Sequence, residues 1–263
     1  MTNLLKSDFF ALLKSKIMYI VLAICIIFPL FTVLVDFGLT KITVTLEEDV
    51  PVDIDSLFKA RTIMFSNFSL TNNIGLIIPI FAGILLMSDI KNGTIRNKVI
   101  IGYSRIKIYL SHLIVSTIFC VGMSLISFLF SSGGSLIFFK YGYPFNGAEA
   151  WNIVKCLLIG LLAFAYAASL STFFALVTKS TPMTIIFTLV TVIAVGLASG
   201  LGSLLPDKYR YISYMIPTYA SIEVASSGAL SNEVFLFGLG SFLLFIAANS
   251  VLGIYIFNRN DLK

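Results

Sequence analysis

Six blocks of about twenty mostly apolar residues, separated by segments that hold most of the charge, dominate this 263-residue sequence. A helix of that length matches the roughly 30 Å hydrocarbon core of a bilayer, at about 1.5 Å rise per residue. Apolar residues make up 58% of the chain and charged residues only 12%. A single soluble core cannot hide that much apolar surface. We therefore predict an all-α membrane protein with six transmembrane helices, and the composition argues against a soluble enzyme.

The whole chain reads as one transmembrane domain, 1–263. Before the first span, Leu5, Phe9 and Leu12 recur at helical spacing, which predicts an interfacial helix over 2–16, or else a plain extension of the first span. Pro217 interrupts a moderately apolar stretch near the end of the chain, as do Glu223 and Gly228. That stretch fits an outer re-entrant hairpin better than a seventh span. The predicted hairpin covers about 211–230. The six predicted spans cover about 17–36, 69–88, 108–130, 152–177, 183–204 and 234–257.

The second span is the weakest of the six. It starts with Ser69, Thr71, Asn72 and Asn73, and its strongly apolar part, 74–87, is too short to cross a bilayer unaided. We expect the polar turn to lie near the outer interface or to face protein instead of lipid.

The distribution of lysine and arginine predicts the orientation. With the N-terminus inside, the inner segments carry 11 of the 18 basic residues in short loops, and the longer outer loops dilute the other seven. Short basic loops are typical of the cytoplasmic side. Both termini are therefore predicted to be cytoplasmic. Lys155 and Arg61 fall among the outer residues in this scheme.

The sequence offers few residues for catalysis. His112 is the only histidine and has no carboxylate near it in sequence, so we expect a polar group at a helix end instead of a metal ligand or a triad member. The three cysteines lie inside apolar blocks, which indicates buried and inert thiols. No phosphate-binding loop with the Gly-x-x-x-x-Gly-Lys-Ser/Thr pattern occurs. The middle of each span lacks charge, which argues against ion-coupled transport.

Segment 89–107, between the second and third spans, predicts a short amphipathic helix on the inner face. Gly93-Thr94 can begin it, with Thr94 as its cap. Such a helix is a docking surface for lipid headgroups or for a soluble partner. On the predicted helix, the apolar residues are expected to share one face and the basic residues to lie elsewhere. The apolar residues are Ile95, Val99 and Ile100, and the basic residues are Arg96 and Lys98.

The run from Pro79 to Tyr109 resembles the cytoplasmic coupling region of ABC-2 type transporter permeases. In that family an acidic residue ends the second span, and Gly-Thr, a short helix and a Ser-Arg step follow. This chain has Asp89 where Glu is common. The Ile216-Pro217 stretch resembles the family's outer re-entrant hairpin, and 257–261 its usual C-terminal ending.

The resemblance implies a permease without enzymatic activity of its own, in a bacterial plasma membrane. Two permease chains, identical or different, would pair, and two copies of a cytoplasmic ATPase would dock on 89–107 and 2–16. ATP and Mg²⁺ would be bound by the ATPase, and no metal or nucleic acid by this chain. Small members export amphipathic peptides, antibiotics or lipid-like compounds. The implied ATPase-coupling residues are Asp89, Gly93, Thr94, Arg96, Lys98 and Arg105.

Two outer residues are candidates for a gate, Pro217 and Glu223, although a residue placed like Glu223 is more often simply solvated. The alternative function, from another class, is an intramembrane enzyme or a non-transporting membrane regulator. An enzyme should place paired Glu/His or Ser/Asp side chains inside its spans, and a regulator should work without an ATPase.

Overall fold

The computed structural model describes residues 1–46, 59–204 and 209–259, and this part of the chain is helical without a β-strand. Its elements in chain order are α1 (Thr2–Lys14), α2 (Lys16–Leu46), α4 (Ala60–Phe65), η1 (Ser66–Phe68), α5 (Asn73–Lys91), α6 (Thr94–Ile100), α7 (Arg105–Phe138), α8 (Gly147–Thr178), α9 (Thr181–Ser203), α10 (Arg210–Tyr214), α11 (Pro217–Ser227) and α12 (Asn232–Arg259).

Six helical stretches are long and apolar enough to cross a membrane, which confirms the predicted all-α membrane fold. They are α2, the stretch from Ala60 to Lys91, α7, α8, α9 and α12. Large apolar side chains such as Ile27, Leu129 and Leu244 stay exposed on the outer surface of the bundle. A surface of this kind is soluble in lipid and not in water.

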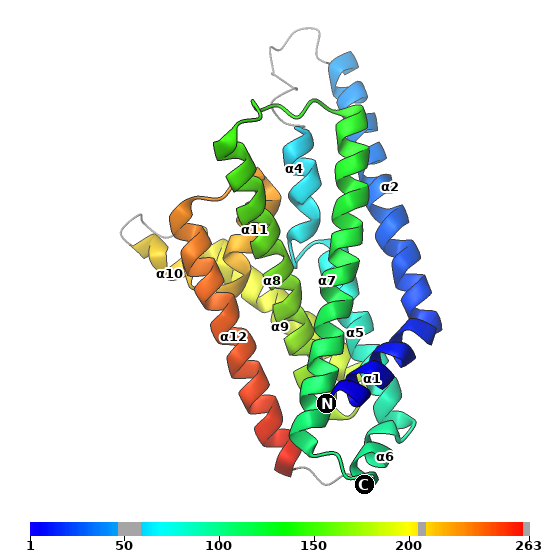
Figure 1. The fold of residues 1–263 in the computed structure, drawn as a ribbon. Coiled ribbons are helices and arrows are strands. Elements are labelled where there is room, and N and C mark those ends of the chain that lie inside the picture. The colour runs from blue at the N-terminus through cyan, green and yellow to red at the C-terminus, as the bar shows by residue number, and fades with distance from the viewer. Residues whose placement is uncertain (47–58, 205–208, 260–263) are drawn as a thin grey trace.

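The second crossing is built from two pieces, where the sequence predicted a single span at 69–88. The short helix α4 and the 3-10 turn η1 come first, and a polar turn then leads into α5 (Figure 1). In that turn the Ser69 and Thr71 hydroxyls lie 2.8 Å apart, and the Asn72 amide donates to the Ser66 carbonyl at 2.9 Å. Ser69 is buried. Asn72 and Asn73 are exposed, so the turn faces protein only through Ser69, and its position relative to the outer interface stays a prediction.

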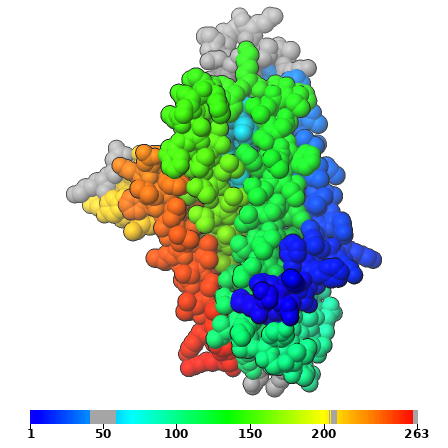
Figure 2. All heavy atoms as spheres, viewed as in Figure 1, coloured from blue at the N-terminus to red at the C-terminus, as the bar shows by residue number. Residues whose placement is uncertain are grey.

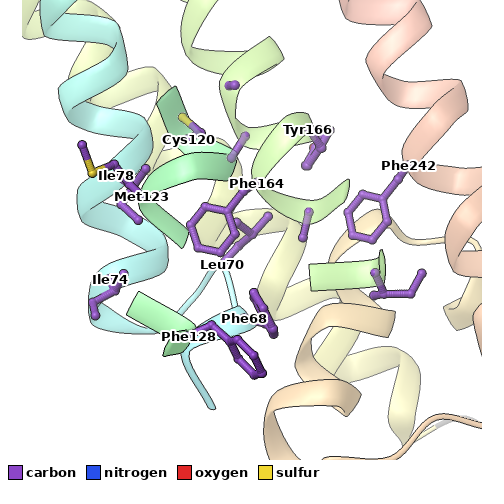
Figure 3. Packing of buried hydrophobic residues seen from close by; sticks show 14 of the residues in the cluster. Phe68, Leu70, Ile74, Ile78, Cys120, Met123, Phe128, Phe164, Tyr166 and Phe242 are labelled. Carbon is purple, nitrogen blue, oxygen red and sulfur yellow. The ribbon is translucent and has the colours of Figure 1, made fainter. Parts of the chain in front are cut away.

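The core of the bundle lies where this turn meets α7 and α8 (Figure 3). The rings of Phe68 and Phe128 stack with centroids 5.2 Å apart, and Phe164 lies in the same cluster. α8 is the most deeply buried of the six long helices. A Cβ atom built at Gly160 would come within 2.4 Å of the Phe68 ring, so the close contact between α8 and η1 requires glycine there.

The chain between α9 and α12 forms two short helices, α10 and α11. α11 has 11 residues and is too short to cross a bilayer. The Thr218 hydroxyl donates to the Val195 carbonyl at 3.0 Å and lies 2.6 Å from the Ser199 hydroxyl, which fixes the start of α11 to α9.

One end of the bundle gathers α1, α6 and the last turn of α12 (Figure 1). We call it the α6 end. α1 lies across the bundle there, and its side chains cover the surface beside α6 (Figure 2). Leu4, Asp8 and Leu12, at intervals of four residues, face the bundle, while Phe9 and Phe10 are exposed. The start of α4 and the connection from α7 to α8 lie at the opposite end.

Candidate functional site

A buried ion pair joins α1 to α6 at the α6 end. The Lys98 ammonium donates to one carboxylate oxygen of Asp8 at 2.6 Å, and the Ser111 hydroxyl of α7 donates to the other oxygen at 2.6 Å. The two charged side chains are only 8% and 4% exposed. Three elements far apart in sequence are therefore held by one polar centre.

His112 extends this centre toward α5. Its Nε2 lies 3.2 Å from the Lys98 ammonium, and its Nδ1 lies 3.9 Å from a carboxylate oxygen of Asp89. An ammonium group can only donate, so Nε2 must accept and the imidazole is neutral, with its proton on Nδ1. The expectation that His112 has no nearby carboxylate was wrong, because Asp8 and Asp89 come close only in the folded chain.

A cavity of about 290 Å³ opens beside His112, between α1, α5 and α7. Asp8, Asp89 and His112 line its polar part, while Leu85, Val115 and Phe119 are among its apolar walls. The size lies just below the roughly 300–1,000 Å³ that is typical of small-molecule sites. Within the described residues, no group of three or more His, Cys, Asp and Glu side chains could hold a metal ion.

The short helix predicted within 89–107 exists as α6, with two differences in detail. Gly93 and not Thr94 occupies the N-cap position, with a left-handed φ of 70°, and Thr94 is the first helical residue. Lys98 is buried and Ile100 is 72% exposed, so the expected division of faces was wrong for both. The ion pair with Asp8 holds Lys98 on the inner side, and Ile100, two residues later and so about 200° around the helix, lies on the opposite side.

Among the predicted coupling residues, Arg96 is exposed on α6, whereas Arg105 joins two helices. The Arg105 guanidinium donates to the carbonyls of Phe257 and Asn258 at 3.2 and 3.0 Å, which fixes the start of α7 to the end of α12. Arg96 and Lys91 line a second cavity of about 250 Å³ at this end. The structure thus groups the predicted coupling residues at the α6 end but gives them different surroundings.

The predicted outer residues lie on α11, away from the α6 end (Figure 1). Pro217 is buried at the first position of this helix, and Glu223 is half-buried two turns later. Burial raises the pKa of Glu223 above its ordinary value, although Arg210 and Tyr219 oppose this shift.

A second polar cluster, which no sequence pattern predicted, joins α4, α8 and the end of α11. Arg61 contacts Glu149 at 3.1 Å and also donates to the Ser227 carbonyl at 3.3 Å. The Tyr141 hydroxyl donates to the same carboxylate at 2.7 Å, and burial together with Glu149 raises the pKa of Tyr141. Arg61 and Lys155, counted above among the outer residues, are both buried within helices.

At the α6 end, sequence reasoning missed Asp8, Ser111 and the partners of His112. One signal was available for Asp8, since it lies midway between Leu4 and Leu12 on the buried face of α1. A charged residue on an apolar face of a helix is usually paired. No comparable periodicity marked Ser111.

A family model described as ABC-2 family transporter protein matches residues 4–195, which includes α1, α6 and the cavity beside His112. No curated protein matches the chain.

Proposed function

We propose that this chain, which belongs to the ABC-2 family of transporter proteins, is the permease of an ATP-driven exporter. It works with a separate cytoplasmic ATPase. The family makes the chain a multi-pass membrane permease of an ABC transporter. The ATPase partner, the direction of transport and the substrate are the proposed parts. ATP and Mg²⁺ would be bound by the ATPase.

The observation that carries the ATPase proposal is the exposed side of α6. Arg96 and Asn97 are exposed, and the apolar side chains of Ile100 and Ile101 are 72% and 75% exposed just after them. An apolar pair beside a cation suits a protein partner, which can bury the former and pair with the latter. We infer that α6 docks on the ATPase and that this end of the bundle is cytoplasmic.

Movement of α6 would be transmitted through its buried contacts. Lys98 ties α6 to α1 through Asp8, and the same carboxylate binds α7 through Ser111. Arg105 ties the start of α7 to the end of α12. A displacement of α6 by the ATPase therefore reaches α1, α7 and α12 through charged or hydrogen-bonded contacts. Gly93, with its left-handed backbone, and Thr94 form the junction at which α6 leaves α5.

The remaining parts of the proposal extend the family analogy. Two ATPase copies would serve a pair of permeases, identical or different, in a bacterial plasma membrane. The cargo would be an amphipathic peptide, an antibiotic or a lipid-like compound, and α11 with Pro217 and Glu223 would form an outer re-entrant gate. The mostly apolar interior of the bundle supports a cargo with apolar surface.

Co-expression with candidate ABC ATPase subunits from the same genome tests the proposal. The ATPase should co-purify with the permease in mild detergent, and Arg96→Glu should reduce transport-coupled ATP hydrolysis by about tenfold, because a reversed charge at an interface costs about 1.4 kcal/mol or more. Lys140→Glu is the matched control, since Lys140 is exposed at the opposite end. Failure of any ATPase to co-purify would favour the enzyme or regulator alternative.

A further inference from the structure

We propose that the cavity between α1, α5 and α7 binds the primary ammonium group of an amphipathic amine, with its apolar tail directed into the bundle. The ligand class includes aminophospholipids and free single-chain amines. Three features support this ligand: the shape of the cavity, one carboxylate that pairs with no lysine or arginine, and one buried hydroxyl without a hydrogen-bond partner.

The cavity runs along two antiparallel helices. Asp89 of α5 faces His112 of α7, and Ala82 and Phe119, each seven residues further into the bundle, also line it. Seven helical residues rise about 10 Å. The cavity is therefore elongated along the bundle, polar at the α6 end and apolar at the inner end. A headgroup at a membrane surface with its tail in the hydrocarbon core has the same polarity.

The polar end holds one carboxylate, that of Asp89, on which Lys98 acts only from beyond ion-pair distance because its ammonium is bound to Asp8. Asp8 is neutralised by Lys98, and its second oxygen accepts from Ser111. His112 is neutral because its Nε2 accepts from Lys98. Among the described residues, no lysine or arginine nitrogen lies within 4.0 Å of Asp89.

Lys14 also lines the cavity, but its ammonium lies 4.4 Å from the centre of the Phe10 ring, where the ring face holds it by a cation–π contact. Asn92 donates to the Ser88 hydroxyl at 3.4 Å, and both side chains border the cavity beside Asp89. The rim of α5 thus presents oxygen acceptors around one carboxylate. A primary ammonium has three N–H donors for such a rim, whereas a quaternary ammonium has none.

The buried hydroxyl belongs to Ser116, which lies one helical turn beyond His112. Its hydroxyl is buried without a hydrogen-bond partner in the described structure, the residue is 8% exposed, and it lines the cavity. A buried hydroxyl without a partner is costly, and a bound ligand or water would remove that cost. One turn corresponds to about 5.4 Å. The ligand therefore fits best with a second polar group about that far from its ammonium, as in the phosphodiester of an aminophospholipid.

Native mass spectrometry of the full-length chain, released from detergent with bound lipid, tests the proposal. We expect phosphatidylethanolamine to be retained over phosphatidylcholine and phosphatidylglycerol of the same acyl chains. Asp89→Asn should lower this retention by about tenfold or more, and Ser116→Ala by about threefold, since a hydrogen bond to a charged group is the stronger of the two. Leu85→Trp, which fills the cavity and leaves every charge in place, should abolish retention.

The matched controls are Asp36→Asn, a carboxylate on α2 outside the cavity, and Ser132→Ala, a hydroxyl elsewhere on α7. Both should retain the lipid like the wild type. Elution as a single species in size-exclusion chromatography shows which variants are folded.

A second arm adds dodecylamine to the lipid-free protein. Retention of dodecylamine without retention of phosphatidylethanolamine identifies a free amphipathic amine as the occupant, and the opposite result identifies the lipid. Equal retention of all three lipids with no dodecylamine adduct, or unchanged binding in Asp89→Asn, overturns the proposal and leaves a water-filled cavity. The measurement needs no ATPase, so its outcome is independent of whether an ATPase co-purifies.

Discussion

At the scale of single residues, the charge at position 98 matters most because it is almost entirely removed from water. A buried pair stabilises little compared with apolar residues of the same size, but breaking it leaves one charge uncompensated. Lys98 also donates toward His112, so the loss of its ammonium affects three side chains at once.

We expect Lys98→Met to lower the free energy of unfolding by about 3–5 kcal/mol, because Asp8 is then buried without its cation. Thermal unfolding in detergent, followed by circular dichroism, measures the change. Lys91→Met, at an exposed lysine of the same end, should stay within about 0.5 kcal/mol of the wild type. The double variant Asp8→Asn/Lys98→Met should recover part of the loss. Equal stability of Lys98→Met and Lys91→Met would contradict the role of the Asp8–Lys98 pair.

Gly160→Ala tests the closest approach in the core. The added Cβ would lie 2.4 Å from the Phe68 ring, and that ring is fully buried against Phe128 and has no free space to move into. Overpacking of this kind costs about 1–3 kcal/mol, measurable as a lower unfolding midpoint. Gly122→Ala is the control, since no atom lies within 4 Å of its Cβ position. That helical substitution should be neutral or stabilising, and a loss there equal to that of Gly160→Ala would count against the packing argument.

At the scale of elements, the sequence predicted the number and type of the long helices because each is a continuous apolar block. The break in the second crossing was predicted only as a weak start, because α4 contains Arg61 and so falls outside an apolar window. Arg61 is tolerated there through Glu149, which lies 88 residues away. No local pattern reveals a pair at that distance.

The α11 helix gives a prediction about pH. Burial raises the pKa of Glu223 above 4.5, which means that folding favours the protonated form. The contribution of Glu223 to stability is therefore fully present below its unfolded pKa and is lost as the pH rises through its folded pKa. Glu223→Gln has no such loss. We expect its unfolding midpoint to gain on that of the wild type as the pH rises above about 4.5.

Thermal unfolding at several pH values measures this difference. Ser226→Ala, an exposed neutral neighbour on α11, should differ from the wild type by the same amount at every pH. A difference between Glu223→Gln and the wild type that does not change with pH would show that the carboxyl group of Glu223 is solvated like that of a free chain.

At the scale of the whole molecule, the candidate site was harder to predict than the fold. The position of α6 followed from local signals, namely Gly93-Thr94 and the Ser104-Arg105 step. Local signals did not predict which groups surround the residues of α6. Asp8 and Lys98 are 90 residues apart and meet only when α1 folds across the bundle. Amphipathic periodicity places a lysine in water by default, and only a tertiary partner reverses that.

The gathering of α1, α6 and the end of α12 at one end of the bundle makes the membrane orientation testable in one experiment. α1, α6 and the last turn of α12 share one end, so a single orientation fixes all three. The excess of lysine and arginine near this end predicts that it is cytoplasmic. All three native cysteines are fully buried, so a thiol reagent should leave the unmodified chain unlabelled.

Single cysteines at exposed positions then report each side. Phe145→Cys, where the wild-type side chain is 76% exposed at the end opposite α6, should react in intact cells with a maleimide that cannot cross membranes. Asn97→Cys on α6 should react only after the cells are opened, because its thiol faces the cytoplasm. The reverse pattern would place α6 outside, where no cytoplasmic ATPase could reach it. Labelling of both positions in intact cells would mean that the two ends of the bundle lie on the same side of the membrane, which six crossings with this arrangement of helices do not allow.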